Sequence, residues 1–283
     1  MNIVLIGKGS ILFSLALKIK EYSYLNIDMI IWDNRSNNKK DLHFFENLKK
    51  KFKIIKVKNI NQSSAIKLIK NDIDYILSVN NTQIFNKRFV EIFKNKIINY
   101  HYSLIPSYKG LYSCTKVILK NEKYTGITWH IVTNKIDNGP IVFQKKIMIK
   151  KNENASSLII RLNAECIKTF MEFIKNLKKK RFTKNKKKIK DFRLYLKKDK
   201  YTTISTTMHS KKILQTFKAF DYYPFTSPLP KLKIFLDKFF KINIINKIKK
   251  PNKKFAKFLK INKNEYLIKT LDNKYLKINV CNN

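Results

Sequence analysis

Short apolar runs alternate with helix-like segments over residues 1–101, and this alternation limits the folds open to the chain. Five runs of five to seven residues each predict buried strands: 2–6, 27–32, 52–57, 73–79 and 96–101. The segments between them show the 3.6-residue periodicity of amphipathic helices. Repeated strand–helix units of this kind predict an α/β fold, with a doubly wound, mostly parallel sheet and helices on both faces.

The pattern changes in the second half of the chain. Residues 155–178 predict one long amphipathic helix, and the basic segment 179–204 is typical either of a solvated linker or of a patch that faces RNA. Residues 205–220 predict another helix, and the short alternating runs after a proline-rich corner predict a small β-barrel. We therefore expect an N-terminal domain at 1–178 and a C-terminal domain, a helix plus a barrel, at 205–283.

The composition is strongly basic. The chain has 61 Lys and Arg residues against 19 Asp and Glu residues, which gives a formal net charge of +42 and a pI of about 10.1. One interpretation is a polyanionic partner such as RNA or a membrane surface. The other is a coding sequence rich in A and T, which enriches Lys, Asn and Ile without selection for binding.

Other bounds come from features that the sequence lacks. The start of the chain has too short an apolar stretch for a signal peptide, and no apolar run reaches the ~20 residues of a membrane span. The three cysteines form no CxxC pair and no metal-ligand spacing, which predicts reduced thiols and no metal. We expect a soluble cytoplasmic protein. The cysteines are Cys114, Cys166 and Cys281.

The first predicted strand ends in Gly7-Lys8-Gly9-Ser10. Two interpretations stay open for these glycines: a tight turn between strand and helix, or a cradle for a phosphate. The third glycine of a dinucleotide-binding fingerprint is missing, because Phe13 and Ser14 occupy the positions where it is expected.

Three polar side chains flank apolar runs within residues 97–144. Asn99 and His101 lie two residues apart on a predicted strand, so they project to the same side, and Asp137 follows the apolar segment 126–132. Open α/β sheets place their chemistry at such strand ends. An aspartate can orient and charge a histidine, and an amide N–H can stabilise an oxyanion, so the trio suits acyl transfer to an amine. A core histidine satisfied by a local aspartate is the alternative.

Two motifs surround these residues, NYHYSLIPSYKG at 99–110 and TGITWHIVTNKIDNGPIVFQ at 125–144. They resemble the two signatures of the 10-formyltetrahydrofolate-dependent formyltransferases, Asn-x-His-x-Ser-Leu-Leu-Pro-x-x-x-Gly and Thr-Gly-x-Thr…His…Asp-x-Gly-x-Ile…Gln. The predicted strands and the terminal β-domain are similar to those of two-domain members of the methionyl-tRNA formyltransferase type.

The resemblance implies an enzyme that moves a formyl group from 10-formyltetrahydrofolate to a primary amine, without a metal. In this family pattern Asn99 and His101 stabilise the oxyanion of a tetrahedral intermediate. Asp137 supports protonated His101 and helps to move the proton of the amine.

The resemblance also implies roles for neighbouring residues. Two segments are expected to line the pocket for the pterin ring, and their residues are Gln83, Ile84, Phe85, Lys135 and Ile136. Four residues are expected to support the site, His130 by holding a loop and Ser103 by a local hydrogen bond; the four are Ser103, Gly110, His130 and Gly139.

The acceptor is less constrained. The turn GKGSILF and the short loop 33–41 differ from methionyl-tRNA formyltransferases, whereas RLNAEC at 161–166 and the stretch 219–232 resemble formyltransferase domains of nonribosomal peptide synthetases. We therefore expect an amino acid, an amino sugar or a carrier-bound aminoacyl group as acceptor. The alternatives are initiator tRNA, a hydrolase that releases formate, and a non-catalytic RNA-binding protein.

Overall fold

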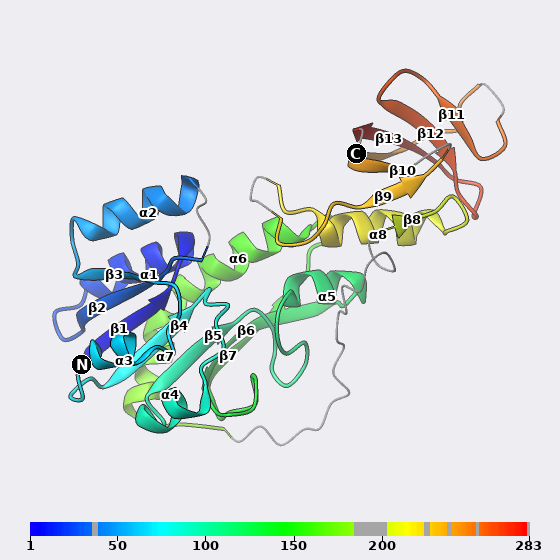
Figure 1. Cartoon of the computed structure of the whole chain (residues 1–283). Coiled ribbons are helices and arrows are strands. Elements are labelled where there is room, and N and C mark those ends of the chain that lie inside the picture. The colour runs from blue at the N-terminus through cyan, green and yellow to red at the C-terminus, as the bar shows by residue number, and fades with distance from the viewer. Residues whose placement is uncertain (36–38, 184–202, 224–226, 237–238, 253–254, 282–283) are drawn as a thin grey trace. The chain divides into compact units, whose positions relative to one another are not determined.

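The computed structural model describes residues 1–35, 39–183, 203–223, 227–236, 239–252 and 255–281 (Figure 1). Two compact units emerge. The N-terminal unit contains the described residues of 1–113, 124–148 and 161–192, and the C-terminal unit contains those of 114–123, 149–160 and 193–283. Most of the predicted basic linker lies outside the described residues, and the domain boundaries expected from the sequence stay a prediction.

A seven-stranded sheet forms the centre of the N-terminal unit, in the order β3-β2-β1-β4-β5-β6-β7. Strands β3, β2, β1, β4 and β5 are parallel, β6 is antiparallel to β5, and β7 is antiparallel to β6. The sheet is therefore mixed and mostly parallel, as predicted. Its strands are β1 (Asn2–Gly7), β2 (Asn26–Asp33), β3 (Ile54–Val57), β4 (Tyr75–Val79), β5 (Ile97–His101), β6 (Tyr124–Ile131) and β7 (Ile141–Met148).

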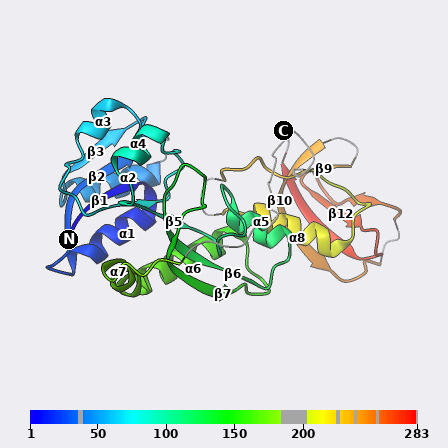
Figure 2. The ribbon, with the colours of Figure 1, turned by 90° about the horizontal axis from the view of Figure 1, so that it is seen from below.

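Helices follow the strands of this unit in the predicted alternation (Figures 1 and 2). They are α1 (Gly9–Lys20), α2 (Lys39–Lys49), α3 (Ser63–Lys67), α4 (Lys87–Ile92) and α7 (Phe170–Lys178), together with the part of α6 (Ala155–Lys168) from Arg161 onward. Strand β1 ends at Gly7 and helix α1 begins at Gly9, so only Lys8 separates them and the two glycines of GKGS form a tight strand–helix turn.

The prediction of a single helix at 155–178 is wrong about its continuity, because the structure divides this segment at Thr169 into α6 and α7. The Thr169 hydroxyl donates a hydrogen bond of 2.7 Å to the carbonyl of Glu165, one turn earlier. A threonine that bonds back to its own helix competes with the backbone ladder and bends the helix.

Apolar side chains cover both faces of the sheet. On one face, an apolar cluster that includes Val4 and Ile76 packs against Phe89 of α4. On the other face, the Trp129 ring of β6 stacks on Phe173 of α7 with centroids 4.4 Å apart and planes 14° apart. The strands are therefore packed between two layers of helices, and this packing holds their C-terminal ends in place.

The C-terminal unit is built on a second sheet, with the order β11-β12-β13-β10-β9-β8. Its strands pair antiparallel except for β8 and β9, which are parallel. Among the described residues this order is open, so closure into the expected barrel stays a prediction. The strands are β8 (Thr203–Ile204), β9 (Lys233–Phe235), β10 (Phe239–Ile248), β11 (Phe258–Lys260), β12 (Glu265–Lys269) and β13 (Tyr275–Cys281).

Two further helices are α5 (Ser113–Leu119) and α8 (Ser210–Phe220). The helix predicted at 205–220 therefore begins five residues later than expected. Asp272 explains the start, because its carboxylate accepts hydrogen bonds from the backbone N–H and the hydroxyl of Ser210. Such a contact satisfies a backbone donor that every helix leaves open at its first turn.

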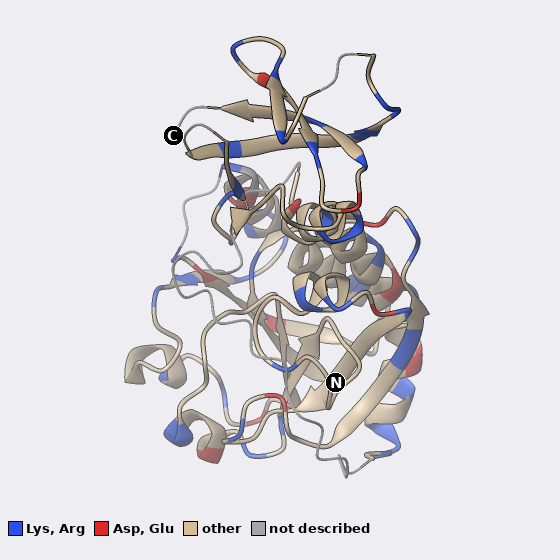
Figure 3. Cartoon of the chain, turned by 90° about the vertical axis from the view of Figure 1, so that its right-hand side faces the viewer, with Lys and Arg blue, Asp and Glu red and all other residues tan. Residues whose placement is uncertain are grey.

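Lys and Arg residues occur on elements of both units (Figure 3). In the part of the chain that the structure describes, no helix is both long enough and apolar enough to cross a bilayer.

Candidate active site

The candidate site lies at the ends of β5 and β6, on the face of the sheet opposite Trp129. Asn99 pairs with His130 across these strands, and His101 pairs with Thr128. Residues that pair directly across neighbouring strands share a face, so all four side chains project to one side. The prediction that Asn99 and His101 point into a common site is consistent with this register.

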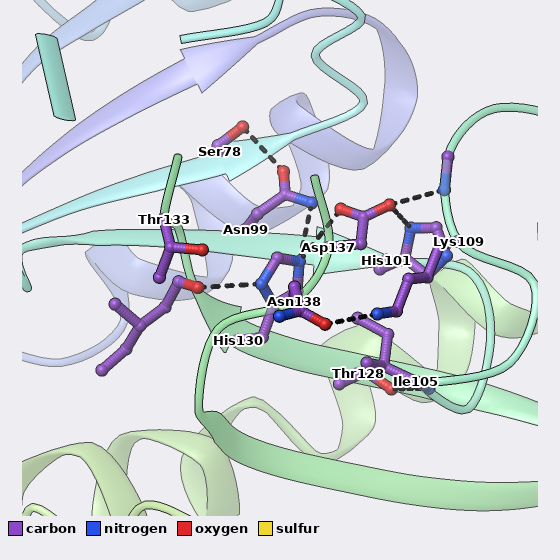
Figure 4. A network of polar contacts seen from close by, with 12 residues as sticks. Ser78, Asn99, His101, Ile105, Lys109, Thr128, His130, Thr133, Asp137 and Asn138 are labelled. Atoms are coloured by element: carbon purple, nitrogen blue, oxygen red, sulfur yellow. Dashed lines mark hydrogen bonds and ion pairs between the residues drawn. The ribbon is translucent and has the colours of Figure 1, made fainter. Parts of the chain in front are cut away.

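Asp137 reaches the same place from the loop between β6 and β7 (Figure 4). Its Oδ2 lies 3.4 Å from Nδ1 of His101, and its Oδ1 lies 3.3 Å from Nε2 of His130. The backbone N–H of Gly110 donates a third contact, 2.7 Å to Oδ2. The carboxylate of Asp137 thus joins His101, His130 and the backbone of Gly110.

The charge of Asp137 is stabilised by these neighbours. Burial of the carboxylate acts to raise its pKa, but the hydrogen bond with His130, the charges of the two histidines and the Gly110 N–H outweigh burial and hold the pKa well below its ordinary value. At neutral pH the site therefore contains a fixed negative charge beside two imidazole rings.

The other ring nitrogen of His101, Nε2, also has polar neighbours. Its Nε2 lies 3.0 Å from the carbonyl oxygen of Tyr108 and 3.2 Å from the hydroxyl of Ser113. Because a carbonyl oxygen only accepts, Nε2 must carry a proton to make the first contact. The Nδ1 side faces Asp137, so each ring nitrogen of His101 faces an oxygen acceptor.

Asn99 has one fixed end. Its Oδ1 accepts a hydrogen bond of 2.9 Å from the hydroxyl of Ser78 on β4, which leaves the Nδ2 amide as the end directed at the site. That amide lies 3.3 Å from Nε2 of His130, whose Nδ1 donates to the carbonyl of Ile131 at 3.0 Å. An amide donor, an imidazole and a carboxylate therefore converge within one hydrogen-bonded network (Figure 4).

The predicted pterin-pocket residues lie on two loops. Gln83 uses its side chain to accept from the backbone N–H of Ile60 at 2.8 Å, and the Phe85 ring packs on Phe89 with centroids 4.8 Å apart. These two side chains are therefore engaged in holding their loop. Ile84 is 67% exposed.

Lys135 and Ile136 lie on the β6–β7 loop, directly before Asp137, and both are exposed. The carbonyl of Lys135 accepts from the Thr133 hydroxyl at 3.1 Å, which closes a local turn. A role for this loop and for 83–85 in pterin binding stays a prediction.

The predicted supporting residues have structural partners. Ser103 makes the expected local hydrogen bond, donating to the carbonyl of Ser107 at 2.7 Å. Gly110 has a φ of +74°, a conformation that side chains disfavour, and this turn aims its N–H at Asp137. Gly139 lies so close to Ile131 that a Cβ would stand 1.9 Å from its carbonyl oxygen.

Several residues of the network were not predicted from the sequence. Ser78 is a polar residue inside an apolar strand, and that contrast is a usable signal. The sequence gives no comparable indication of Ser113 or of the Tyr108 carbonyl. Serine is common at the start of a helix, and every residue has a backbone carbonyl. Lys109 and Asn138 link the two loops around Asp137 by a side-chain hydrogen bond (Figure 4).

No group of three or more His, Cys, Asp or Glu residues within the described ranges could hold a metal ion. The three cysteines are free thiols, and burial raises the pKa of Cys114 and Cys166 well above the ordinary value. They lie outside the polar network.

Comparison with known proteins identifies the family. A model described as "Formyl transferase" matches residues 3–174, more than half of the chain and all of the network. The chain therefore belongs to the formyl transferase family, and the resemblance of its two motifs is confirmed at the level of the family.

The names of similar proteins include a formyltransferase for methionyl-tRNA and one for a nucleotide-linked sugar. A methionyl-tRNA formyltransferase of Thermodesulfovibrio yellowstonii is 35% identical over 97 residues, which are 34% of this chain and 32% of that protein. A GDP-perosamine N-formyltransferase of Brucella melitensis is 32% identical over 106 residues, 38% of this chain and 41% of that protein. The matched part of this chain thus spans well under half the length of these curated relatives.

A solved structure extends the likeness in fold. The N-formyltransferase from Helicobacter canadensis, crystallised with folinic acid and dTDP-3-aminofucose, has a TM-score of 0.71 and 20% sequence identity. The match covers 99% of this chain and 99% of that one. At this identity the likeness shows the fold.

Proposed function

We propose that this protein is an N-formyltransferase that moves a formyl group from 10-formyltetrahydrofolate to a primary amine. The single observation that carries the proposal is the convergence of Asn99, His101 and Asp137 in one hydrogen-bonded network at the ends of β5 and β6. Family membership over residues 3–174 supports the same reaction class.

The network fits a carbonyl group that gains negative charge. The Ser78 hydroxyl donates a hydrogen bond to the amide oxygen of Asn99. The amide N–H group of Asn99 is therefore oriented so that it can donate to a formyl oxygen. A donor aimed at developing oxyanion charge lowers the barrier most when it is already oriented. Asn99 therefore acts as the oriented donor for that oxygen.

His101 and Asp137 handle the proton and its charge. Both nitrogens of His101 face oxygen atoms, and the carboxylate 3.4 Å from Nδ1 supports the positive charge of the protonated ring. The positive charge of His101 stabilises the reacting carbonyl as it becomes negative. Asp137 assists removal of the proton from the attacking amine. As the bond from the amine to the formyl carbon forms, the bond from that carbon to N10 breaks, and tetrahydrofolate leaves with a proton on N10. 10-Formyltetrahydrofolate supplies the activated formyl group when bound.

We further propose that the acceptor is the amine of a nucleotide-linked sugar. Local identity does not separate the acceptor classes, because the methionyl-tRNA and perosamine relatives match to a similar degree. Support comes from the end-to-end match with the Helicobacter canadensis enzyme, whose crystals contained dTDP-3-aminofucose. Transfer to initiator tRNA remains the second candidate, and the basic composition is the observation in its favour.

An acceptor panel tests this proposal. The protein is incubated with 10-formyltetrahydrofolate and, separately, a dTDP- or GDP-linked amino sugar, methionyl initiator tRNA, or buffer alone. We expect an N-formylated sugar nucleotide, detected by mass spectrometry, and no formylated tRNA. If formylated tRNA is the only product, the acceptor is tRNA and the proposal of a sugar acceptor is wrong. Release of formate in buffer alone would contradict N-formyl transfer.

A further inference from the structure

Two residues of the second sequence motif, Thr128 and Gln144, have no role in the chemistry described so far. Thr128 pairs with His101 on one side and with Gln144 on the other, so the three residues form one row across β5, β6 and β7. Paired residues of neighbouring strands share a face, so all three side chains lie on the face that carries the polar network.

The Thr128 hydroxyl is fully buried and holds the segment that follows β5. It donates a hydrogen bond of 2.6 Å to the carbonyl of Ser103 and accepts one of 3.3 Å from the backbone N–H of Ile105. One hydroxyl thus satisfies two backbone groups of the same loop.

Gln144 reinforces that hold from the next strand. Its Nε2 donates to the Thr128 hydroxyl at 2.9 Å and to the carbonyl of Ile105 at 3.0 Å (Figure 4 shows Thr128 and Ile105 beside the site). The two side chains therefore hold residues 103–105 by three hydrogen bonds, and a fourth joins Gln144 to Thr128.

Gly126 gives this loop room to approach the sheet. It lies two residues before Thr128 on the same face of β6, and a Cβ there would stand 2.4 Å from the Leu104 side chain. The motif Thr-Gly-x-Thr thus combines a space for Leu104 with an anchor for the backbone on either side of it.

The held loop leads directly to His101. The Ser103 hydroxyl donates to the carbonyl of Ser107, and the next carbonyl, that of Tyr108, accepts from Nε2 of His101. Tyr108 has a φ of +57°, so its backbone occupies a conformation that needs support from its surroundings.

We propose that Thr128 and Gln144 are positioning residues, which act through the loop 103–108 to hold the Tyr108 carbonyl on Nε2 of His101. They thereby keep Nε2 of His101 in its hydrogen bond as a donor and fix how the ring is turned toward Asp137. In the network described above neither side chain forms a hydrogen bond with His101, so we assign their effect to the backbone of the loop that they hold.

The test uses a Thr128→Val variant, which keeps the shape of the side chain and removes the hydroxyl. Thr125→Val is the matched control, since Thr125 is a buried threonine of the same strand, and among the described residues its hydroxyl has no hydrogen-bond partner. Thr128→Ser restores the hydroxyl and serves as the rescue. Gln144→Met, at an exposed position of β7, provides a milder variant in case Thr128→Val does not fold.

The first readout needs no turnover. In protein labelled with ¹⁵N at its four histidines, the signal of His101 is assigned by its loss in His101→Gln. We expect wild type, Thr125→Val and Thr128→Ser to show a hydrogen-bonded Nε2–H that exchanges slowly with water, and Thr128→Val and Gln144→Met to lose that protection. An unchanged His101 signal in folded Thr128→Val, or equal loss in Thr125→Val, would overturn the proposal.

The second readout is kinetic and rests on the proposed function. We expect Thr128→Val to lower kcat roughly ten-fold or more with little change in KM, because misplacement of a reacting group affects the transition state. Thr128→Ser should recover most of the loss. If wild type forms no formylated product, the proposed function fails, whereas the histidine signals still decide the positioning role.

Discussion

Replacing Asp137 with Asn separates the charge of this residue from its shape. Asparagine keeps an oxygen that accepts from the Gly110 N–H, so the loop geometry is preserved while the negative charge beside His101 is lost. If the carboxylate supports positive charge on His101 during formyl transfer, the variant must lose activity without losing its fold.

The geometry sets the size of this effect. Two opposite unit charges 3.4 Å apart, the distance from Asp137 Oδ2 to His101 Nδ1, interact by about 5 kcal/mol at an effective dielectric constant of about 20. Only the part that grows as charge develops on His101 lowers the barrier, so about 5 kcal/mol is an upper limit. Because about 1.4 kcal/mol is a factor of ten in rate, we expect kcat of Asp137→Asn to fall by roughly 10³.

The assay is steady-state formyl transfer with an amine acceptor, accompanied by thermal unfolding of each variant. KM should change little, since the interaction strengthens in the transition state. Asp272→Asn is the matched control: the backbone N–H of Ser210 and the hydroxyls of Thr270 and Ser210 lower the pKa of Asp272, but it lies in the C-terminal unit. A folded Asp137→Asn protein with kcat within roughly ten-fold of wild type refutes the reasoning.

Three further perturbations follow from the structure. The pKa of Asp137 in the folded protein lies below its ordinary value of 3.8, so this group contributes its full stability above that value and loses it as the pH falls further. Urea unfolding should therefore show that the free energy of unfolding decreases less below about pH 4 in Asp137→Asn than in wild type. Phe173→Ala should lower the free energy of unfolding by about 3–5 kcal/mol, since it empties the space against Trp129; an equal urea midpoint would contradict this. Ser78→Ala should lower kcat by freeing the Asn99 amide to turn, while far-ultraviolet circular dichroism stays unchanged.

Local patterns were enough to predict most of the sheet. The apolar runs correspond to β1 to β5, because buried strands of a parallel sheet need continuous apolar sequence. The break at Thr169 was missed, since the apolar positions of the helix continue through it and a single side-chain bond to Glu165 decides the bend. The late start of α8 at Ser210 was missed because its partner, Asp272, lies 62 residues away.

The site shows the same division between local and distant information. Asn99 and His101 share a strand, so their common face follows from strand geometry alone. The approach of Asp137 depends on the antiparallel turn between β6 and β7. Its position after an apolar run left open a core histidine satisfied by a local aspartate, and the motif resemblance then favoured the catalytic interpretation. The Tyr108 carbonyl could not be predicted, since every residue has a carbonyl and only the folded loop selects one.

The most direct test of N-formyl transfer through this network follows the formyl group itself. Wild-type protein, His101→Ala and His43→Ala, a histidine exposed on α2, are incubated with ¹³C-formyl-labelled 10-formyltetrahydrofolate and a nucleotide-linked amino sugar. Mass spectrometry of the acceptor should detect a labelled N-formyl group with wild type and His43→Ala, and none with His101→Ala. Absence of label from every amine tested with folded wild type, or equal labelling by His101→Ala, would contradict the account.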